Sequence, residues 1–373
     1  MNKIKSEVTN KTDLKSLNRQ ELQNFCSELG LHSYRVDQIF QWLYQKGVSG
    51  FEEMTNLSKD LRSHLDDICV VKKISIHRQQ KSADGTTKFL FSLDDESDDK
   101  IEAVLIPDFY PDGAVNRLTV CVSSQVGCVF GCSFCATGKM GFYKNLNHGE
   151  IIDQVHIINE YAEHEFGKGI TNIVYMGMGE PLHNYNAVTE SASILSDPLG
   201  LEISPRRITV STVGLTKQIK RLADEYQPFN LAISLHAADD EKRDKIMPVN
   251  QSMNLEKLEE AVKYYFHKQK KPLTYEYLLF NQFNDSVTDA KKLAKIAHWV
   301  PSKVNIIMYN SVDGVELKRA KEDRLDNFMR TLIHHDVTAT VRRSRGDDID
   351  AGCGQLAVTE GRERGKSLDI KNR

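Results

Sequence analysis

The fold is decided by residues 118–138, LTVCVSSQVGCVFGCSFCATG, a stretch of 21 residues with four cysteines and no charged side chain. A membrane span has a similar length, but it needs a more uniformly apolar composition than this mixture of serine, glutamine, glycine and cysteine. Cys128, Cys132 and Cys135 follow the spacing C-x3-C-x2-C. Three soft thiolates at this spacing can hold three corners of an iron–sulfur cube and leave the fourth iron open for chemistry.

A structural zinc site is the competing interpretation of these cysteines. Such a site needs four ligands in tetrahedral geometry. Cys121 precedes Cys128 by seven residues, so it could be the fourth ligand only if it has no other role. Packing of Cys128, Cys132 and Cys135 in an apolar core is disfavoured, because the loop that carries them is rich in glycine and follows directly after an expected strand.

From residue 118 onward, expected strands and helices alternate. The strands are expected at 118–123, 172–177, 207–212, 230–235, 273–280, 303–309 and 337–343. Helical patterns lie between them at 149–164, 184–195, 215–225, 240–246, 254–268, 287–298 and 321–335. This alternation predicts an α/β fold of parallel strands with right-handed crossovers. We expect a partial (β/α)6-type barrel, with a full barrel or a doubly wound open sheet as the alternatives.

Smaller units flank the barrel. We divide the chain into a helical module at 1–68, a short β extension at 69–117, the barrel at 118–357 and a disordered tail at 358–373. In the module, Asn18 and Glu21 resemble a capping box, and Ser58 can cap a later helix. In the extension, strands are expected at 70–77, 87–93 and 101–106, with a turn at Asp84-Gly85.

Charge and composition indicate a soluble cytoplasmic protein. The 373 residues include 49 basic and 52 acidic side chains, and the N-terminus has no apolar core of a signal peptide. The near-neutral balance excludes a uniformly basic surface, but local basic clusters remain. They occur at residues 201–221, where five basic residues face one acidic residue, at 267–271 and at 342–345. Together they would suit phosphate contacts if they met at one barrel mouth.

Several polar residues come at the ends of expected strands, where barrel enzymes place their sites. They are Gly179, Glu180, Ser211, Ser234, Leu235, His236 and Asn310. Cys26 and Cys69 are expected to pack in a core. Two further cysteines, Cys121 and Cys353, differ from them. Cys353 lies between two glycines after the last strand, which suits a reactive thiol, and Cys121 lies within the deciding stretch.

The C-x3-C-x2-C spacing is a signature of radical S-adenosylmethionine (SAM) enzymes, and the wider sequence resembles the RlmN/Cfr family of radical SAM RNA methyltransferases. The resemblance covers about residues 16–67 and 100–357. It is carried by 33–44 (SYRVDQIFQWLY), 121–128 (CVSSQVGC), 132–138 (CSFCATG), 177–182 (GMGEPL), 204–212 (SPRRITVST) and 342–356 (RRSRGDDIDAGCGQL). One departure is Gly352, where alanine is usual in the family.

This resemblance implies the cofactors and the site. Cys128, Cys132 and Cys135 would hold a [4Fe–4S] cluster, and SAM would be used twice per turnover. The polar strand-end residues would contact SAM, namely Gly179, Glu180, Ser211, Ser234, Leu235, His236 and Asn310. Cys353 would carry the methyl group as S-methylcysteine, Cys121 would resolve the RNA adduct through a transient disulfide with Cys353, and Glu102 would accept a proton.

The resemblance also implies the substrates. The family methylates C2 of one adenosine of 23S rRNA and of the adenosine 3′ of the tRNA anticodon, and Pro181 favours this branch. The alternative is the Cfr-like branch, which methylates C8 of the same rRNA adenosine and confers antibiotic resistance. We expect the helical module to bind RNA and the protein to be a monomer. We also expect it to need an electron donor such as a flavodoxin system and to make no contact with a membrane.

Two other functions compete with this one. A radical SAM enzyme with a small-molecule substrate would keep the cluster but would have no use for Cys353. A zinc-stabilised RNA-binding protein would use Cys121, Cys128, Cys132 and Cys135 as ligands and would not be an enzyme.

Overall fold

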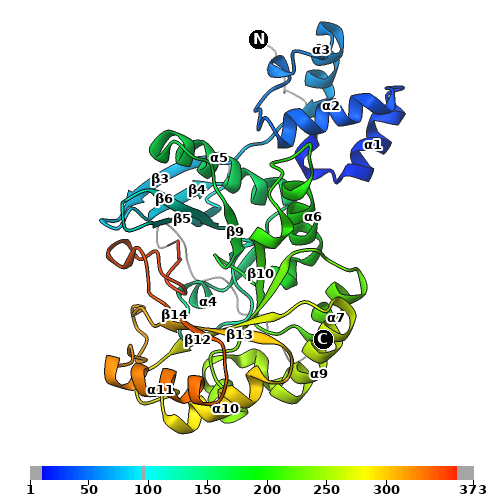
Figure 1. Ribbon diagram of the computed structural model, residues 1–373. Coiled ribbons are helices and arrows are strands. Elements are labelled where there is room, and N and C mark those ends of the chain that lie inside the picture. Colours follow the sequence, from blue (N-terminus) through cyan, green and yellow to red (C-terminus); the bar gives the residue numbers. More distant parts are fainter. Residues whose placement is uncertain (1–10, 95–96, 359–373) are drawn as a thin grey trace, which may run out of the picture.

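A ten-stranded sheet forms the centre of the molecule in the computed structural model, which describes residues 11–94 and 97–358 (Figure 1). Its strand order is β14-β13-β12-β11-β10-β9-β6-β5-β4-β3. The bounds are β3 Ser75–Lys81, β4 Thr87–Ser92, β5 Lys100–Phe109, β6 Val115–Cys121, β9 Asn172–Tyr175, β10 Ile208–Thr212, β11 Asn230–Ser234, β12 Leu273–Leu279, β13 Ser302–Met308 and β14 Ala339–Arg342. The strands from β6 to β14 pair in parallel, whereas β3 to β6 pair antiparallel.

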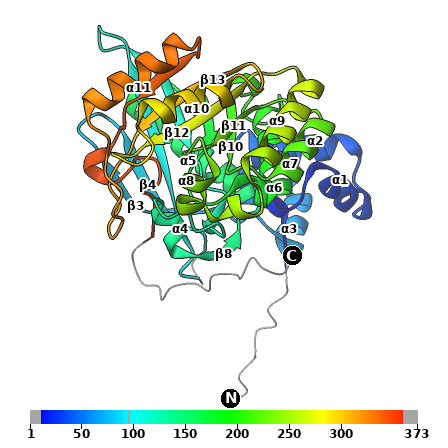
Figure 2. The same cartoon turned by 90° about the horizontal axis from the view of Figure 1, so that it is seen from below.

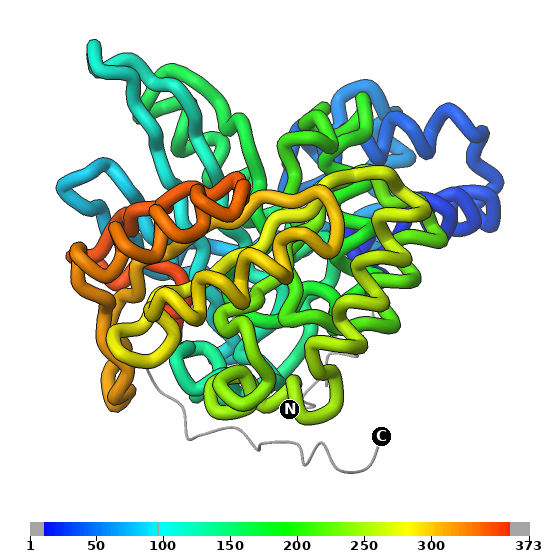
Figure 3. Tube along the Cα trace, turned by 60° about the horizontal axis from the view of Figure 1, so that its bottom comes forward, coloured from blue at the N-terminus to red at the C-terminus, as the bar shows by residue number. Residues whose placement is uncertain are grey.

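Helices connect the parallel strands in a regular β-then-α order. They are α5 His148–Phe166, α6 Tyr185–Ser196, α7 Thr216–Asp224, α8 Asp240–Ile246, α9 Leu255–Gln269, α10 Val287–Ala297 and α11 Glu322–His334. Six strand–helix units are followed by β14, so the predicted partial (β/α)6 barrel is confirmed. The parallel strands follow chain order without the reversal of a doubly wound sheet. Figure 3 shows this order as a colour gradient from green to orange across the barrel.

The parallel strands are buried, as strands covered on both faces should be. In β12, every residue from Tyr275 to Leu279 is buried. Glu276 is the one carboxylate in that strand, and its exposed fraction is only 4%. A buried carboxylate in an otherwise apolar strand needs a partner, so its surroundings bear on the site described below.

The β extension continues the sheet of the barrel and forms no layer of its own. β3, β4 and β5 add to the side of β6 as antiparallel neighbours. The predicted turn at Asp84-Gly85 is confirmed, because it joins β3 to β4. The strand predicted at 70–77 is wrong in position: a short strand β2, Cys69–Val70, comes first, and β3 begins only at Ser75.

The helical module consists of α1 Arg19–Glu28, α2 Ser33–Tyr44 and α3 Lys59–Ile68 (Figures 1 and 2). Both predicted caps are confirmed: Asn18 and Glu21 form a capping box, and the Ser58 hydroxyl accepts a hydrogen bond from the Leu61 N–H at 3.3 Å. The module is closed by a short strand β1, Thr12–Asp13, which pairs in parallel with β2. Most of the predicted tail, 359–373, lies outside the described residues. None of the helices described is both long enough and apolar enough to cross a bilayer.

Candidate active site

Cys128, Cys132 and Cys135 lie on a folded loop after β6, whose last residue is Cys121. This loop contains β7 Gln125–Gly127, the short helix α4 Ala136–Met140 and β8 Phe142–Asn145, and β7 pairs antiparallel with β8. Gly127 has a φ of 73°, and a Cβ there would lie 1.8 Å from the Gly141 carbonyl oxygen. Only glycine fits at this position, so the loop can close on itself tightly.

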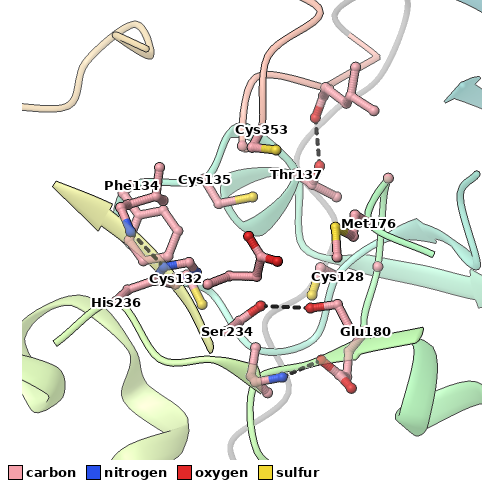
Figure 4. Close-up of a pocket in the computed structure, with 18 of the residues that line it drawn as sticks. Cys128, Cys132, Phe134, Cys135, Thr137, Met176, Glu180, Ser234, His236 and Cys353 are labelled. Carbon is pink, nitrogen blue, oxygen red and sulfur yellow. Dashed lines mark hydrogen bonds between the residues drawn. The ribbon is translucent and has the colours of Figure 1, made fainter. Parts of the chain in front are cut away.

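Cys128, Cys132 and Cys135 line one cavity, which we call the first cavity (Figure 4). Among the described residues, no three His, Cys, Asp or Glu side chains are grouped so that they could hold a single metal ion. Zinc needs thiolates that converge on one point, with bonds of about 2.3 Å. In an iron–sulfur cube each thiolate reaches a different iron, so a cluster does not need three thiolates that converge on one point.

Glu180 enters the first cavity from the end of β9. Its carboxylate accepts hydrogen bonds from the N–H groups of Leu182 at 3.0 Å and Val213 at 2.9 Å. Burial raises the pKa of Glu180 to about 7. The preceding Gly179 has a φ of 96°, and a Cβ there would lie 2.5 Å from the Gln125 Cβ. The predicted Gly-Glu pair is therefore fixed both by its backbone and by its hydrogen bonds.

Ser211, Ser234 and His236 also line the first cavity, from the ends of β10 and β11. The two serine hydroxyls are 3.0 Å apart. The His236 Nδ1 accepts a hydrogen bond from the Leu278 N–H at 3.1 Å, and burial lowers the pKa of His236 to about 3. The ring is therefore neutral near pH 7, with its proton on Nε2.

Two predicted SAM contacts, Leu235 and Asn310, do not line the first cavity. The Leu235 side chain is fully buried, and its N–H donates to the Glu276 carbonyl at 3.0 Å. Asn310 is buried as well, and its carboxamide lies against Gly352, where an added Cβ would come within 1.9 Å of the Asn310 Nδ2.

Cys353 reaches the first cavity from the loop after β14. Three hydrogen bonds hold the residues that follow it. The Gly354 carbonyl accepts from the Ala136 N–H at 2.7 Å, the Leu356 carbonyl accepts from the Thr137 hydroxyl at 2.5 Å, and the Ala357 N–H donates to Glu102 at 2.9 Å. The loop that carries the thiol is thus held by residues from two other parts of the chain, α4 and β5.

A second cavity lies on the other side of Cys353. It is lined by both Cys353 and Cys121, which are free thiols, and by Arg342, Arg343 and Arg345. Its apolar lining consists of Ile106, Met176, Ile307, Ala351 and Leu356. Burial, followed by the neighbouring Cys353, raises the pKa of the Cys121 thiol to about 12. Apolar walls beside basic side chains suit a nucleotide, and Cys353 lines both this cavity and the first cavity.

Glu102, the predicted proton acceptor, lines neither of these two cavities. It lies on β5 with an exposed fraction of 3%, and its carboxylate lies 3.3 Å from the Lys88 Nζ. Burial raises the pKa of Glu102, and Lys88 opposes that shift. Its bond to the Ala357 N–H shows that Glu102 helps to hold the Cys353 loop.

The three basic clusters do not meet at one mouth, contrary to the expectation from sequence. Arg206 and Arg207 precede β10 and therefore lie at its amino end, while Ser211 lies towards its carboxyl end. Lys271 precedes β12 in the same way, and its ammonium donates to the Gln227 and Pro228 carbonyls at 3.0 and 2.8 Å. Because the strands are parallel, Arg206, Arg207 and Lys271 lie at the end of the barrel opposite the site, whereas the whole cluster at 342–345 lies at the end that holds it. From the cluster at 201–221, Lys217 begins α7 after the carboxyl end of β10 and so lies towards the site.

The sequence did not single out Glu276, which also lines the first cavity. In chain order it falls between Ser234 and Cys353. A single carboxylate in a buried, apolar strand is the signal that could have identified it. The sequence also did not single out Thr137, whose hydroxyl holds Leu356. Nothing in its local sequence sets this threonine apart from an ordinary helix residue.

Known proteins match this chain over nearly its whole length. Residues 12–71 match the family described as the ribosomal RNA large subunit methyltransferase N-terminal domain, and residues 122–294 match the radical SAM superfamily. A probable dual-specificity RNA methyltransferase RlmN of Salinibacter ruber is 53% identical over 93% of this chain and 94% of its own length. The dual-specificity RNA methyltransferase RlmN of Nautilia profundicola is 42% identical over 89% and 95%.

A solved structure resembles this chain over nearly its whole length. The crystal structure of a radical SAM methyltransferase from Sphaerobacter thermophilus is 40% identical in sequence, with a TM-score of 0.84. The match covers 92% of this chain and 99% of that chain. The shared fold therefore includes the helical module, the β extension and the barrel.

Proposed function

The chain belongs to the RlmN family of radical SAM RNA methyltransferases, and we propose that it methylates C2 of adenosine in both 23S rRNA and tRNA. The observation that carries the proposal is the position of Cys353, whose thiol lines both the first and the second cavity. A methyl carrier must meet the donor on one side and the acceptor on the other. Cys121 in the second cavity is placed to resolve what Cys353 forms there.

The adenine carbon explains why a carrier is needed. C2 of adenine is an electrophilic carbon, so it cannot attack a SAM methyl group directly. A [4Fe–4S] cluster held by Cys128, Cys132 and Cys135 would supply the electron that cleaves SAM to a 5′-deoxyadenosyl radical. Glu180, Ser211, Ser234 and His236 would hold SAM in the first cavity, and we propose that two SAM molecules are used in each turnover.

The steps on this chain's own residues run through the two thiols. Cys353 first takes a methyl group from SAM as S-methylcysteine, which releases S-adenosylhomocysteine. After that methyl group loses a hydrogen atom to the 5′-deoxyadenosyl radical, its methylene carbon bonds to the adenine carbon, and the adduct then loses the proton on that carbon and one electron, which the cluster would take back. Cys121 then attacks the Cys353 sulfur, the bond from that sulfur to the methylene carbon breaks, the released carbon takes up a proton to complete the new methyl group, and the cysteines are left as a disulfide. Two electrons from outside, for example from a flavodoxin system, must reduce that disulfide before the next turnover.

We propose Glu102 as the acceptor of the proton that leaves adenine. Its raised pKa favours proton uptake, because burial disfavours the charged carboxylate. Its oxygens contact Lys88 and the Ala357 N–H, so it can reach the second cavity only when the Cys353 loop shifts. We propose that the enzyme acts as a monomer and that its helical module contributes to RNA binding.

Mass analysis of nucleosides tests the position of methylation. The reduced, cluster-loaded enzyme is incubated with SAM and either 23S rRNA or tRNA, and the RNA is then digested. We expect 2-methyladenosine from both substrates. Recovery of 8-methyladenosine from rRNA would instead place the protein in the Cfr-like branch and overturn the C2 assignment.

The Cys121→Ala variant tests the carrier mechanism. Without the resolving thiol, the bond between Cys353 and the adenine carbon should persist, so the purified variant should carry covalently bound RNA. The matched control is the double variant Cys121→Ala/Cys353→Ala, which lacks the carrier and should carry none. Equal amounts of bound RNA in both variants would rule out Cys353 as the carrier.

A further inference from the structure

The carboxylate of Glu276 belongs to a row of polar side chains that crosses the inside of the barrel. Ser234, Glu276, Asn305 and Thr340 are register partners on β11, β12, β13 and β14, so their side chains point to the same face. The Glu276 Oε1 accepts a hydrogen bond from the Asn305 Nδ2 at 2.8 Å, and the Asn305 Oδ1 accepts one from the Thr340 hydroxyl at 2.8 Å. This chain of bonds fixes the orientation of the carboxylate.

The row is interrupted between Glu276 and Ser234, where both side chains line the first cavity. Within the described residues, the Glu276 Oε2 is buried and has no hydrogen-bond partner. The Ser234 hydroxyl shares one hydrogen bond with Ser211 and keeps further capacity to donate or accept. A buried carboxylate oxygen without a donor is unfavourable, so this gap indicates a ligand that supplies donors.

The surroundings of the gap define what kind of donor fits. Arg342 already supplies positive charge to Glu276, so a second cation is not required there. Glu276 lines the first cavity and not the second, which separates it from Cys121, Arg343 and the proposed RNA site. Two neighbouring neutral O–H donors, as on a ribose, match a carboxylate oxygen beside a serine hydroxyl. Acidic residues recognise ribose hydroxyls in the same way in dinucleotide-binding folds.

We propose that Glu276 binds the ribose hydroxyls of SAM in the first cavity and orients the adenosyl group towards Cys353. This inference rests on the proposed function, because it takes SAM to be the occupant of that cavity. Asn305 is the positioning residue that keeps the carboxylate turned towards the cavity.

Binding of two unreactive probes tests the proposal without turnover. The probes are S-adenosylhomocysteine and its 2′,3′-dideoxy analogue, and their Kd values are measured anaerobically on the cluster-loaded protein. We expect the parent protein to bind S-adenosylhomocysteine about 10- to 100-fold more tightly than the dideoxy analogue, because hydrogen bonds to a charged group are lost. Equal affinity for the two probes in the parent protein would overturn the proposal without any variant.

The Glu276→Gln variant assigns the preference to this side chain. It should lose most of the discrimination and still bind the dideoxy analogue as the parent does. Thr331→Val, on helix α11 and outside the row, is the matched control that also removes one hydroxyl, and it should keep the discrimination within about twofold. Equal weakening of both probes in Glu276→Gln would show a structural role only and contradict the proposal. Failure of every protein, the parent included, to bind either probe would instead contradict the proposed SAM site.

Discussion

Gly352 shows how one residue type is selected by space and not by backbone conformation. Its φ is not in the left-handed region, unlike that of Gly354 at 83°. An added Cβ at residue 352 would instead lie 1.9 Å from the Asn310 Nδ2 and 2.7 Å from the Gln355 Oε1. The departure from the alanine usual in the family is therefore matched by the position of Asn310, whose carboxamide occupies that space.

The Gly352→Ala variant tests this account. We expect it to lower the free energy of unfolding by about 1 to 3 kcal/mol, because the new methyl group overpacks a buried site. Adding Asn310→Ser should remove most of that penalty, since residues in contact are not additive. Urea unfolding of the four proteins of this cycle provides the measurement. A single Gly352→Ala variant as stable as the parent would show that Asn310 moves away freely.

Helix α5 is the element that joins the helical module to the barrel. Lys15, from the segment after β1, forms a buried ion pair with Asp153 on α5. One turn further along, the His156 Nε2–H donates to the Tyr44 carbonyl at the end of α2, at 2.7 Å. On the other side of the module, Arg19 pairs with Asp197 at 2.7 Å, just after α6. The module is thus attached by polar contacts, two of which are buried, as well as by apolar packing.

His156 makes this junction sensitive to acid. Burial lowers its pKa from 6.5 to about 4, so the folded protein binds fewer protons than the unfolded chain between these values. The stability contributed by the neutral ring is present above pH 6.5 and is lost as the pH falls towards 4. In His156→Gln the amide can still donate to Tyr44 but cannot take up a proton.

We therefore expect the parent protein to lose about 3 kcal/mol more than His156→Gln between pH 7 and pH 4. The measurement is the free energy of unfolding of both proteins at several pH values in that window. The comparison isolates His156 because the other titrating groups are common to both chains. If the free energies of unfolding of the two proteins changed equally with pH, this histidine would not couple folding to pH.

At the scale of the whole molecule, strand polarity decides which charges serve the site. The carboxyl ends of the parallel strands present the two cavities, and Arg343 and Arg345 lie at that end. Arg206 and Arg207 are just as basic and just as exposed, but they lie at the amino end of β10. A basic cluster in the sequence therefore predicts RNA contact only after its end of the barrel is known.

Salt dependence of RNA binding distinguishes the two ends. For a short anticodon stem–loop, the Arg343→Gln/Arg345→Gln variant should reduce the slope of log K against log salt by about 1 to 2, since each phosphate contact contributes about 0.9. The matched control is Arg206→Gln/Arg207→Gln, which removes the same charge from the opposite end and should leave the slope unchanged. If both variants reduced the salt slope equally, RNA binding would depend on the net charge of the protein and not on which end of the barrel carries it.

Much of the fold follows from local patterns. The strands and helices of the barrel lie within a few residues of the predicted ranges, because alternating buried strands and capped helices leave clear periodicity. The strand predicted at 70–77 is wrong in position because an edge strand such as β3, whose residues are mostly exposed, has a weak hydrophobic pattern. Glu276 was missed because its partners, Asn305 and Thr340, come from other strands.

The sequence alone predicted the barrel, which the structure confirms, and it singled out the proposed cluster ligands and the two proposed reactive cysteines, through residue type, short spacing, regular alternation and the family resemblance. Only the tertiary structure decided that Cys353 lines two cavities, that Asn310 lies against Gly352 and that one of the three basic clusters lies as a whole at the end of the barrel that holds the site. The physical reason is that contacts between distant strands depend on register and polarity. Those are set by packing the whole sheet and are not encoded in any single segment.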